Sequence, residues 1–486
     1  MNAINRGDTM QNIRHGLIAG AIAMLFVAFP ASAQDSAIYT QCLKAGTDLH
    51  PNADDVNVAP TDDFPGPGDD DWNGNGIFET AAQNLQGIKC KHLAGGDGMV
   101  TMADVGNKEL YIFSFSEIPM PGEEIPGTSP VEYAPTADSG EYPGFAMDYG
   151  MLAANAPATT ITVDEDDELF LTLTNVGMAM RPDLFDPHTV HWHGFPQASS
   201  VFDGVPDASI SINMGASLTY YYNVKDAGTY MYHCHVEATE HMQMGMLGNL
   251  YVHPRQNKLA IGASLYDAFA TNPANVANGG TTIAPASDTG TPHAAGNTYA
   301  YNDGDGTTRY DVEVPIQLGS FDPDFHDASI GVQPLPFRDM RDRYFLLNGR
   351  GYPDTVDKAV LKTADPMLGE MKPSQPVHSL IEADKNKIIL LRISNLNVTQ
   401  FNTIGFNGPA MKVVALDARL LRDDSGMNMY YETNSLTLGG GQSADVLIDT
   451  TGLGGRTFVL YSTNLDYLAN DAENLGGMMT EIRINP

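Results

Sequence analysis

The sequence has few of the residues that would suit it to nucleic acid or to a membrane. Lys and Arg number 26 against 60 Asp and Glu, a net charge of −34, so anionic polymers and membrane surfaces would be repelled. After residue 33, no stretch approaches the ~20 apolar residues that a transmembrane helix needs. The acidic surface would attract cationic substrates or metal ions, and solubility in a salty medium explains the charge equally well.

Long apolar runs are scarce, and the clearest one lies near the start of the chain. Arg6 and Arg14 precede an apolar run at 17–29, which ends in Ala31-Ser32-Ala33. A basic start, a short apolar run and small residues at its end are typical of a signal peptide. We therefore predict a signal peptide at 1–33 and a periplasmic or secreted protein.

Cysteine is equally scarce, with three in the chain, and the three differ in context. Cys42 and Cys90 lie in an early, loop-like region, where a disulfide is expected in an exported protein. Cys234 stands between His233 and His235, so we interpret it as a metal ligand.

Residues 34–108 are acidic, rich in Gly and Pro, and show little strand periodicity, so they are expected to form an irregular extension. Within them, the segment starting at Asp71 carries side-chain oxygens at alternate positions and the glycine typical of a calcium loop. Ala82 stands where that loop needs a bidentate Glu. Calcium and an ordinary acidic turn both remain open.

The rest of the chain favours an all-β fold, because short runs of high β-propensity recur between turn signals. One such region spans 109–255 and a second spans 310–486, joined by a connector at 256–309 that is rich in Asn, Gly, Thr, Ala and Pro. The clearest strand-like runs are 110–115, 159–163, 169–173, 218–224, 229–232, 250–252, 387–393 and 443–448.

Histidine is concentrated where chemistry is expected. Six of the 13 histidines fall in two short segments, at 188–193 and 233–241. Side chains of a strand alternate between its faces, which sorts the residues of the two segments into two groups. The first group is His188, Cys234, His241 and Met246; the second is His191, His193, His233 and His235.

The two groups suit two kinds of copper site. Two imidazoles, a thiolate and a thioether match a blue-copper electron-transfer site, whereas zinc rarely recruits Met. Four imidazoles suit copper that handles a small oxygen-containing substrate. Cys234 is covalently continuous with the histidines on both sides, so it would connect the two sites.

These segments resemble the multicopper oxidase family, including its two-domain laccases and the related copper nitrite reductases. The resemblance rests on His188-x-x-His191-x-His193-Gly194, Asp203-Gly204-Val205-Pro206, the segment Gly228 to His235, and His241-x-x-x-Gly245-Met246. One departure is the interval of five residues between His235 and His241, which is longer than usual in oxidases of the family.

The resemblance implies two cupredoxin-like Greek-key domains, at 109–255 and 310–486. It also implies that Asp203 is a carboxylate that donates protons near the oxygen-reducing site, with an ordinary turn residue as the alternative. The implied copper ligands are His188, Cys234, His241 and Met246 for type 1, His191 for type 2, and His193, His233 and His235 for type 3.

The second β region looks like a copy of the first that has lost its ligands. Asn402, Gly405 and Asn407 align with the three histidines at 188–193. Tyr461, Ser462 and Thr463 align with His233-Cys234-His235, and Gly477-Met478 with Gly245-Met246.

This loss leaves the oxygen-reducing cluster short of ligands, because the family takes as many histidines again from a second domain. The resemblance implies a homotrimer in which His326 or His378 completes the cluster across an interface. The leading interpretation is an exported oxidoreductase that takes single electrons from a small reducing substrate or metal ion at type 1 copper and passes them through Cys234 to reduce dioxygen.

Two other functions stay open, namely nitrite reduction and copper binding or electron transfer without turnover. The intact four-histidine group argues against a bare carrier, and the missing partner ligands argue against an ordinary laccase. Glu237 and Glu240 flank the expected approach to type 1 copper, where either substrate binding or simple solvation explains them.

Overall fold

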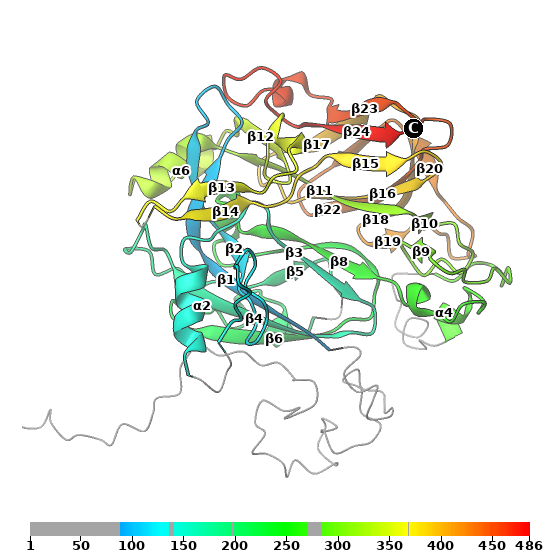
Figure 1. Cartoon of the computed structure of the whole chain (residues 1–486), viewed down its shortest axis with the longest axis horizontal. Helices are drawn as coiled ribbons and strands as arrows, with labels where there is room; N and C mark the ends of the chain where they lie inside the picture. The colour runs from blue at the N-terminus through cyan, green and yellow to red at the C-terminus, as the bar shows by residue number, and fades with distance from the viewer. Residues whose placement is uncertain (1–87, 136–139, 197, 271–282, 368) are drawn as a thin grey trace, which may run out of the picture. The chain divides into compact units, whose positions relative to one another are not determined.

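The computed structural model of the chain describes residues 88–135, 140–196, 198–270, 283–367 and 369–486. All of these residues belong to one unit of internal contacts, Ile38–Pro486. They form an all-β fold of two sandwiches, as the sequence predicted, coloured blue to green and yellow-green to red in Figure 1.

Three expectations concern residues outside the described part of the chain: the signal peptide at 1–33, the calcium loop at Asp71, and Cys42. Cys90 is disulfide-bonded, and its pairing with Cys42 stays a prediction. None of the helices in the described segments is both long enough and apolar enough to cross a membrane.

The first sandwich consists of two four-stranded sheets. One sheet runs in the order β2 (Glu109–Glu117), β1 (Ile88–Thr101), β4 (Glu168–Gly177), β6 (Ser217–Asn223), and the other β3 (Ala158–Asp164), β8 (Leu247–His253), β7 (Gly228–His233), β5 (His191–His193).

The core of this sandwich follows from strand periodicity. Leu169, Leu171 and Leu173 point to one face of β4 and are fully buried. They pack in a cluster that includes Trp192 of β5 and Cys234 just after β7. Cys234, and Trp192 between His191 and His193, therefore belong to the packed core of this sandwich.

The second sandwich has a larger pair of sheets. The first runs β12 (Tyr344–Leu347), β11 (Val312–Phe321), β16 (Ile388–Asn395), β22 (Gln442–Asp449), β18 (Met411–Leu416), β19 (Arg419–Leu420), with β20 (Tyr431–Thr433) beside β18. The other runs β15 (Ile381–Asp384), β24 (Met479–Asn485), β23 (Thr457–Ser462), β17 (Asn402–Phe406), β21 (Ser435–Leu438).

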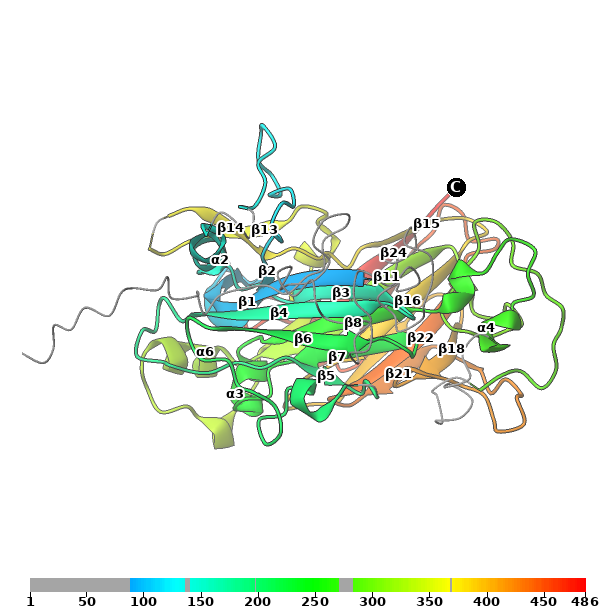
Figure 2. The ribbon, with the colours of Figure 1, turned by 90° about the horizontal axis from the view of Figure 1, so that it is seen from below.

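Short helices and two-stranded ribbons lie outside the two sandwiches. Figure 2 shows α3 close to β5 and β7. Within the described segments the α-helices are α2 (Tyr142–Gly150), α3 (Ala238–Gln243), α4 (Asp267–Ala270) and α6 (Pro323–Ile330). The 3-10 turns are Ser200–Phe202, Arg255–Lys258, Phe337–Asp339, Asp354–Val356 and Leu465–Leu468. The two-stranded ribbons pair β9 (Thr298–Tyr299) with β10 (Arg309–Tyr310), and β13 (Leu361–Ala364) with β14 (Met371–Gln375).

The two sandwiches share a strand register around the histidine segment. In the first, His191 pairs with His233, and in the second, Gly405 pairs with Tyr461. These are the positions that the sequence alignment made equivalent.

The backbone hydrogen bond beside the cysteine position is repeated as well. The amide of Cys234 donates to the carbonyl of Met246 over 3.1 Å, and the amide of Ser462 donates to that of Met478 over 2.9 Å. The internal repeat predicted from the sequence is therefore a structural repeat, with the ligand side chains replaced.

The expected irregular extension at 34–108 is wrong for Ile88–Thr101. These residues form β1, which pairs antiparallel with β2 and parallel with β4. The sequence gives little sign of this strand, since it contains Gly95, Gly96 and Gly98. Pairing on both edges outweighs the weak local propensity.

A buried ionic network joins the two sandwiches. Arg392 of β16 is fully buried, pairs with Glu313 and donates to the hydroxyl of Thr229 in β7 over 3.0 Å. Glu313 also accepts from His253, the last residue of β8, over 3.0 Å. Buried charges of this kind are tolerated only when paired, so the network fixes how β7 and β8 lie against the second sandwich.

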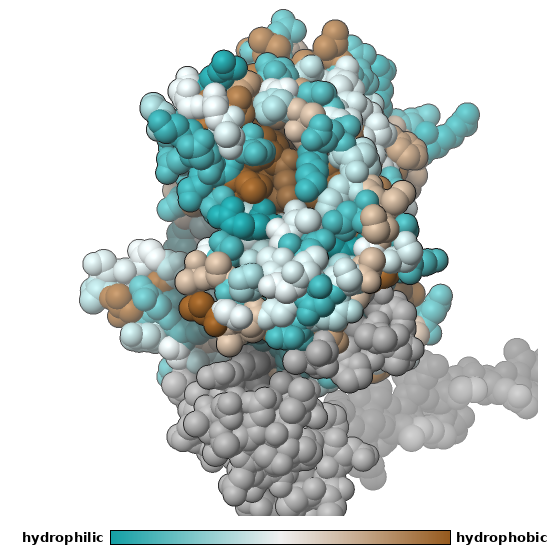
Figure 3. Space-filling view, turned by 90° about the vertical axis from the view of Figure 1, so that its right-hand side faces the viewer, coloured by the Kyte–Doolittle hydropathy of each residue, from teal (hydrophilic) through white to brown (hydrophobic). Residues whose placement is uncertain are grey.

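One face of the molecule is mostly polar. On the face shown in Figure 3 most residues are hydrophilic or intermediate, and the hydrophobic ones gather mainly in one recess. This agrees with the acidic composition of the chain.

Candidate metal centre

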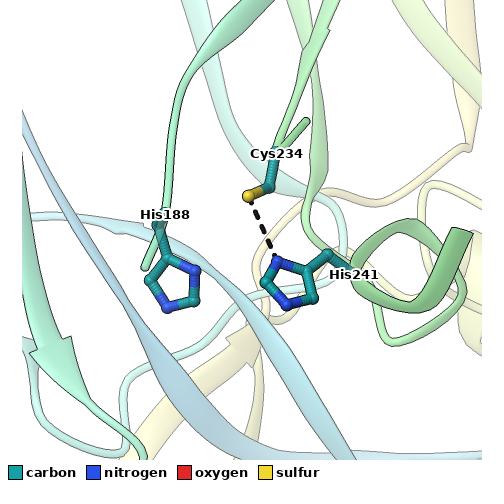
Figure 4. Close-up of side chains that lie close together, drawn as sticks. All are labelled: His188, Cys234 and His241. Atoms are coloured by element: carbon teal, nitrogen blue, oxygen red, sulfur yellow. Dashed lines mark hydrogen bonds between the residues drawn. The ribbon is translucent and has the colours of Figure 1, made fainter. Parts of the chain in front are cut away.

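The first group of predicted ligands meets at one end of the first sandwich. His188 precedes β5, Cys234 follows β7, and His241 lies on α3. Their ligand atoms all lie within 4.8 Å of one another, and Nδ1 of His241 lies 3.2 Å from Sγ of Cys234. Figure 4 shows the three side chains converging from these different segments.

The cluster combines burial with ring nitrogens that lack hydrogen-bond partners. His188, Cys234 and His241 are fully buried. Both ring nitrogens of His188 and Nε2 of His241 lack a hydrogen-bond partner among the described residues. An unsatisfied buried nitrogen costs free energy, and a metal ion coordinated at the ring would remove that cost.

The thiol and the imidazole of the cluster shift each other's pKa. Burial raises the pKa of the Cys234 thiol, but His241 and then His188 bring it well below its ordinary value. Burial lowers the pKa of His241, but Cys234 and Asp186 raise it to about 10. Cys234 is thereby held as a thiolate, the form that binds copper.

Met246 is held next to these residues by its backbone. Its amide donates to the carbonyl of His241 over 2.8 Å, and its carbonyl accepts from Cys234. Its side chain is fully buried in the same core cluster as Cys234. Two imidazoles, a thiolate and a nearby thioether fit blue copper.

The second group of predicted ligands comes from β5 and the end of β7, on the face opposite to the first group. Ligand atoms of His191, His193 and His233 all lie within 4.8 Å of one another. The ring of His235 is 5.1 Å from that of His191, centroid to centroid. The alternation of strand faces therefore separates the two groups as the sequence predicted.

Hydrogen bonds fix the orientation of two of these rings. Nδ1 of His191 donates to the carbonyl of Asp203 over 2.6 Å, and Nδ1 of His233 donates to that of Cys234 over 2.9 Å. Each bond leaves Nε2 free to bind a metal, which is the usual arrangement of histidine ligands. Burial lowers the pKa of His233 to about 3, so this ring is neutral and able to coordinate.

A cleft of about 550 Å³ opens in front of the four rings. The second sandwich forms its opposite wall and offers amides, a hydroxyl and backbone there instead of imidazoles. Among the described residues, the cleft is lined by His191, His193, His233, His235, Met242, Leu396, Asn397, Val398, Thr399, Gln400, Phe401, Gly440 and Gly441.

The histidines expected to complete the cluster lie elsewhere. His326 is fully buried on α6, with Nδ1 2.6 Å from the carbonyl of Tyr111 and Nε2 3.1 Å from that of Gln243. The expectation that it reaches across an interface is therefore wrong. His378 is half-buried and does not line the cleft.

Asp203 lies beside His191, with Oδ1 3.6 Å from its Nδ1. It is not among the residues that line the cleft. This position suits orientation of His191, and its role as a proton donor stays a prediction.

Sequence reasoning missed Asp186, whose carboxylate lies 3.8 Å from Nε2 of His241. The imidazole of His241 nearby is the main cause that lowers the pKa of Asp186. Its position just before His188 was the available signal. Of the two glutamates considered, Glu237 is exposed, whereas Glu240 is buried and burial raises its pKa to about 7.

Two family models, both described as multicopper oxidase, match residues 147–257 and 339–476. A multicopper oxidase of Talaromyces pinophilus is 32% identical over 116 residues, which are 24% of this chain and 18% of that protein. One of Mycobacterium tuberculosis is 36% identical over 80 residues, 16% of this chain and 14% of that protein. The chain thus spans less than a fifth of the length of these curated relatives.

Similarity among solved structures concerns the fold. The blue copper oxidase from Nitrosomonas europaea matches with a TM-score of 0.50 and 19% sequence identity, covering 82% of this chain and 86% of that one. The two-sandwich architecture is therefore shared with a solved copper protein at low sequence identity.

Proposed function

Because the chain belongs to the multicopper oxidase family, we propose that it is a copper-dependent oxidoreductase that reduces dioxygen with electrons taken one at a time from a small reducing substrate or metal ion. The observation that carries the proposal is the position of Cys234. Its thiolate belongs to the buried cluster, and its neighbours in the chain, His233 and His235, face the cleft.

Copper held by these residues would supply one-electron redox chemistry. His188, Cys234 and His241 would hold it in the buried cluster, with Met246 alongside, and the four histidines would hold it at the cleft. The backbone from Cys234 to either neighbouring histidine is a covalent path between the two. The cleft of about 550 Å³ has room for a small acceptor.

The donor approaches the buried cluster from the side of Asp186. Nε2 of His241 points to this carboxylate, whose side chain is 21% exposed. Phe185 next to it is strongly exposed. An apolar side chain and a carboxylate beside an electron-accepting imidazole suit a cationic or aromatic reductant.

The proposal includes export and assembly as expectations from the sequence. Export is tested by the N-terminal residue of the secreted protein, which is Gln34 if 1–33 are removed. A homotrimer is tested by the mass in solution. With His326 enclosed in its own subunit, His378 is the remaining candidate of the two for a ligand supplied to a neighbour.

The deciding experiment measures copper per chain, the electron paramagnetic resonance spectrum and dioxygen uptake with a one-electron donor. Type 1 and type 2 signals together with dioxygen consumption support the proposal. Nitrite consumption without dioxygen uptake would replace the acceptor by nitrite. One copper per chain with a type 1 signal alone would mean that the protein transfers electrons without catalysing a reaction.

A further inference from the structure

The cleft lacks its own acid. Among the described residues that line it there is no carboxylate, and Thr399 is the one residue with a hydroxyl. Thr399 is exposed to the cleft from the second sandwich. Any proton consumed at the four histidines must therefore pass through a neutral group or through water.

The hydroxyl of Thr399 is bonded to a buried acid. Its Oγ1 donates to Oδ2 of Asp342, and the side chain of Asp342 belongs to a residue only 5% exposed. Asp342 also accepts from the hydroxyl of Ser320 and, over 3.1 Å, from Nε2 of Gln243 on α3. Three donors from three segments hold this carboxylate in one orientation.

Asp342 also reaches a second cavity. It lines a cavity of about 470 Å³ together with Arg343, Tyr467 and others, and Gln400 lines both this cavity and the cleft. Asp342 therefore lines a second cavity and is joined by the hydroxyl of Thr399 to the wall of the cleft.

We propose that Asp342 passes protons from this second cavity through the hydroxyl of Thr399 into the four-histidine cleft. The inference rests on the proposed function, because only a reductive reaction in the cleft consumes protons. Dioxygen becomes water by taking one proton for each electron. Nitrite becomes nitric oxide and water by taking two protons for one electron, so the route serves either acceptor.

Each group in the transfer regains the proton that it gives up. A protonated Asp342 donates from Oδ2 to Oγ1 of Thr399, whose own proton turns to the acceptor in the cleft. Asp342 then takes a proton from water in the second cavity, and the hydroxyl of Thr399 again donates to it.

Charged groups also line the second cavity or belong to α6 near Asp342. They come from the segment before β12, from α6 and its first turn, and from the connection between β23 and β24. They are Arg341, Arg343, Asp322, His326, Asp466 and Asp471.

The test separates electron uptake from acceptor reduction. The copper-loaded protein is reduced without oxygen and mixed with dioxygen, and the return of the blue absorption is followed in water and in deuterium oxide. Asp342→Asn and Thr399→Val should slow this return by about 100-fold, the size of a lost acid–base contribution. Because proton delivery would limit the slowed reaction, the rate of both variants should be lower in deuterium oxide than in water.

Conservative variants and a matched control exclude a structural cause. Asp342→Glu and Thr399→Ser should regain most of the rate, and Asp466→Asn, a carboxylate on the second cavity, should match the wild type. Reduction by the donor, copper content and the blue spectrum should be unchanged in all variants. Equal reoxidation of Asp342→Asn and wild type would overturn the proposal.

The copper-free protein supplies an independent readout. The infrared carboxylate band of Asp342, identified as the band missing from Asp342→Asn, should shift in Thr399→Val because one hydrogen bond is lost. An unmoved band would overturn the link between the two residues. If neither dioxygen nor nitrite reoxidises the reduced wild-type protein, the proposed function itself is wrong.

Discussion

Gly441 of the second sandwich lies so close to His193 of the first that a Cβ atom on Gly441 would stand 2.7 Å from Nε2 of the histidine. The φ angle of Gly441 is +86°, which favours glycine. The missing side chain lets the backbone of one sandwich cover a predicted ligand of the other.

Gly441→Ala should therefore displace His193 and lower the copper content of the cleft, while the blue signal of the buried cluster persists. The measurement is copper per chain with the paramagnetic resonance spectrum. Gly452→Ala is the matched control, since Gly452 has a φ of +76° with nothing within 4 Å of the added atom. Equal copper loss in both variants would show that backbone strain alone is responsible.

Cys234→Ser should abolish the blue absorption, because the thiolate is the ligand that distinguishes a blue-copper site. The four-histidine cleft should still take up copper, since two of its rings, His191 and His233, are oriented by backbone carbonyls. The absorption spectrum and copper content test both statements. As a counterpart, Ser462→Cys places a thiol at the equivalent position of the second sandwich and should produce no blue band, because Asn402 stands where His188 does.

Asp203→Asn should reduce turnover only slightly, by about 1 kcal/mol or less in activation free energy, because His191 is bound by the carbonyl of Asp203 and not by its carboxylate alone. The steady-state rate across pH tests this. A large loss in Asp203→Asn, with unchanged copper content, would instead favour the proton-donor role expected from the family resemblance.

Glu168→Gln should stabilise the protein at alkaline pH. Burial raises the pKa of Glu168 from 4.5 to about 7, so its favourable contribution is complete below pH 4.5 and is lost as the pH rises through 7. The variant does not titrate, and its advantage should grow by about 3 kcal/mol between pH 4 and pH 8. Denaturant unfolding of the copper-free protein measures this.

The exposed Glu432 supplies the control for that experiment. Glu432→Gln should change the free energy of unfolding by nearly the same small amount at every pH. A Glu168→Gln advantage that stays constant from pH 4 to pH 8 would contradict the assigned pKa shift.

Much of the site was predictable because it depends on local periodicity. His191, Trp192 and His193 alternate between faces, and so do His233, Cys234 and His235, so the two groups follow from the sequence once the segments are strands. Repeated motifs likewise predicted the second copy. These inferences needed only neighbours in the chain.

The rest depends on contacts between distant segments. Strand β1 forms because β2 and β4 flank it, and its own glycines give no sign of that. Gly441 approaches His193, and Asp342 accepts from Thr399, across long stretches of chain. The enclosure of His326 depends on carbonyls of Tyr111 and Gln243. No spacing rule within one segment reveals such neighbours.

The second sandwich keeps the hydrogen bond from Ser462 to Met478 and the pairing of Gly405 with Tyr461, although no imidazole or thiolate remains at these positions. A β ladder of this design therefore closes without help from an ion. The strand pairing around Cys234 should likewise form before copper binds, so the predicted ligand side chains are already in place in the copper-free protein. Copper would then bind to a protein that is already folded, and copper-free protein should gain its blue absorption when copper is added later.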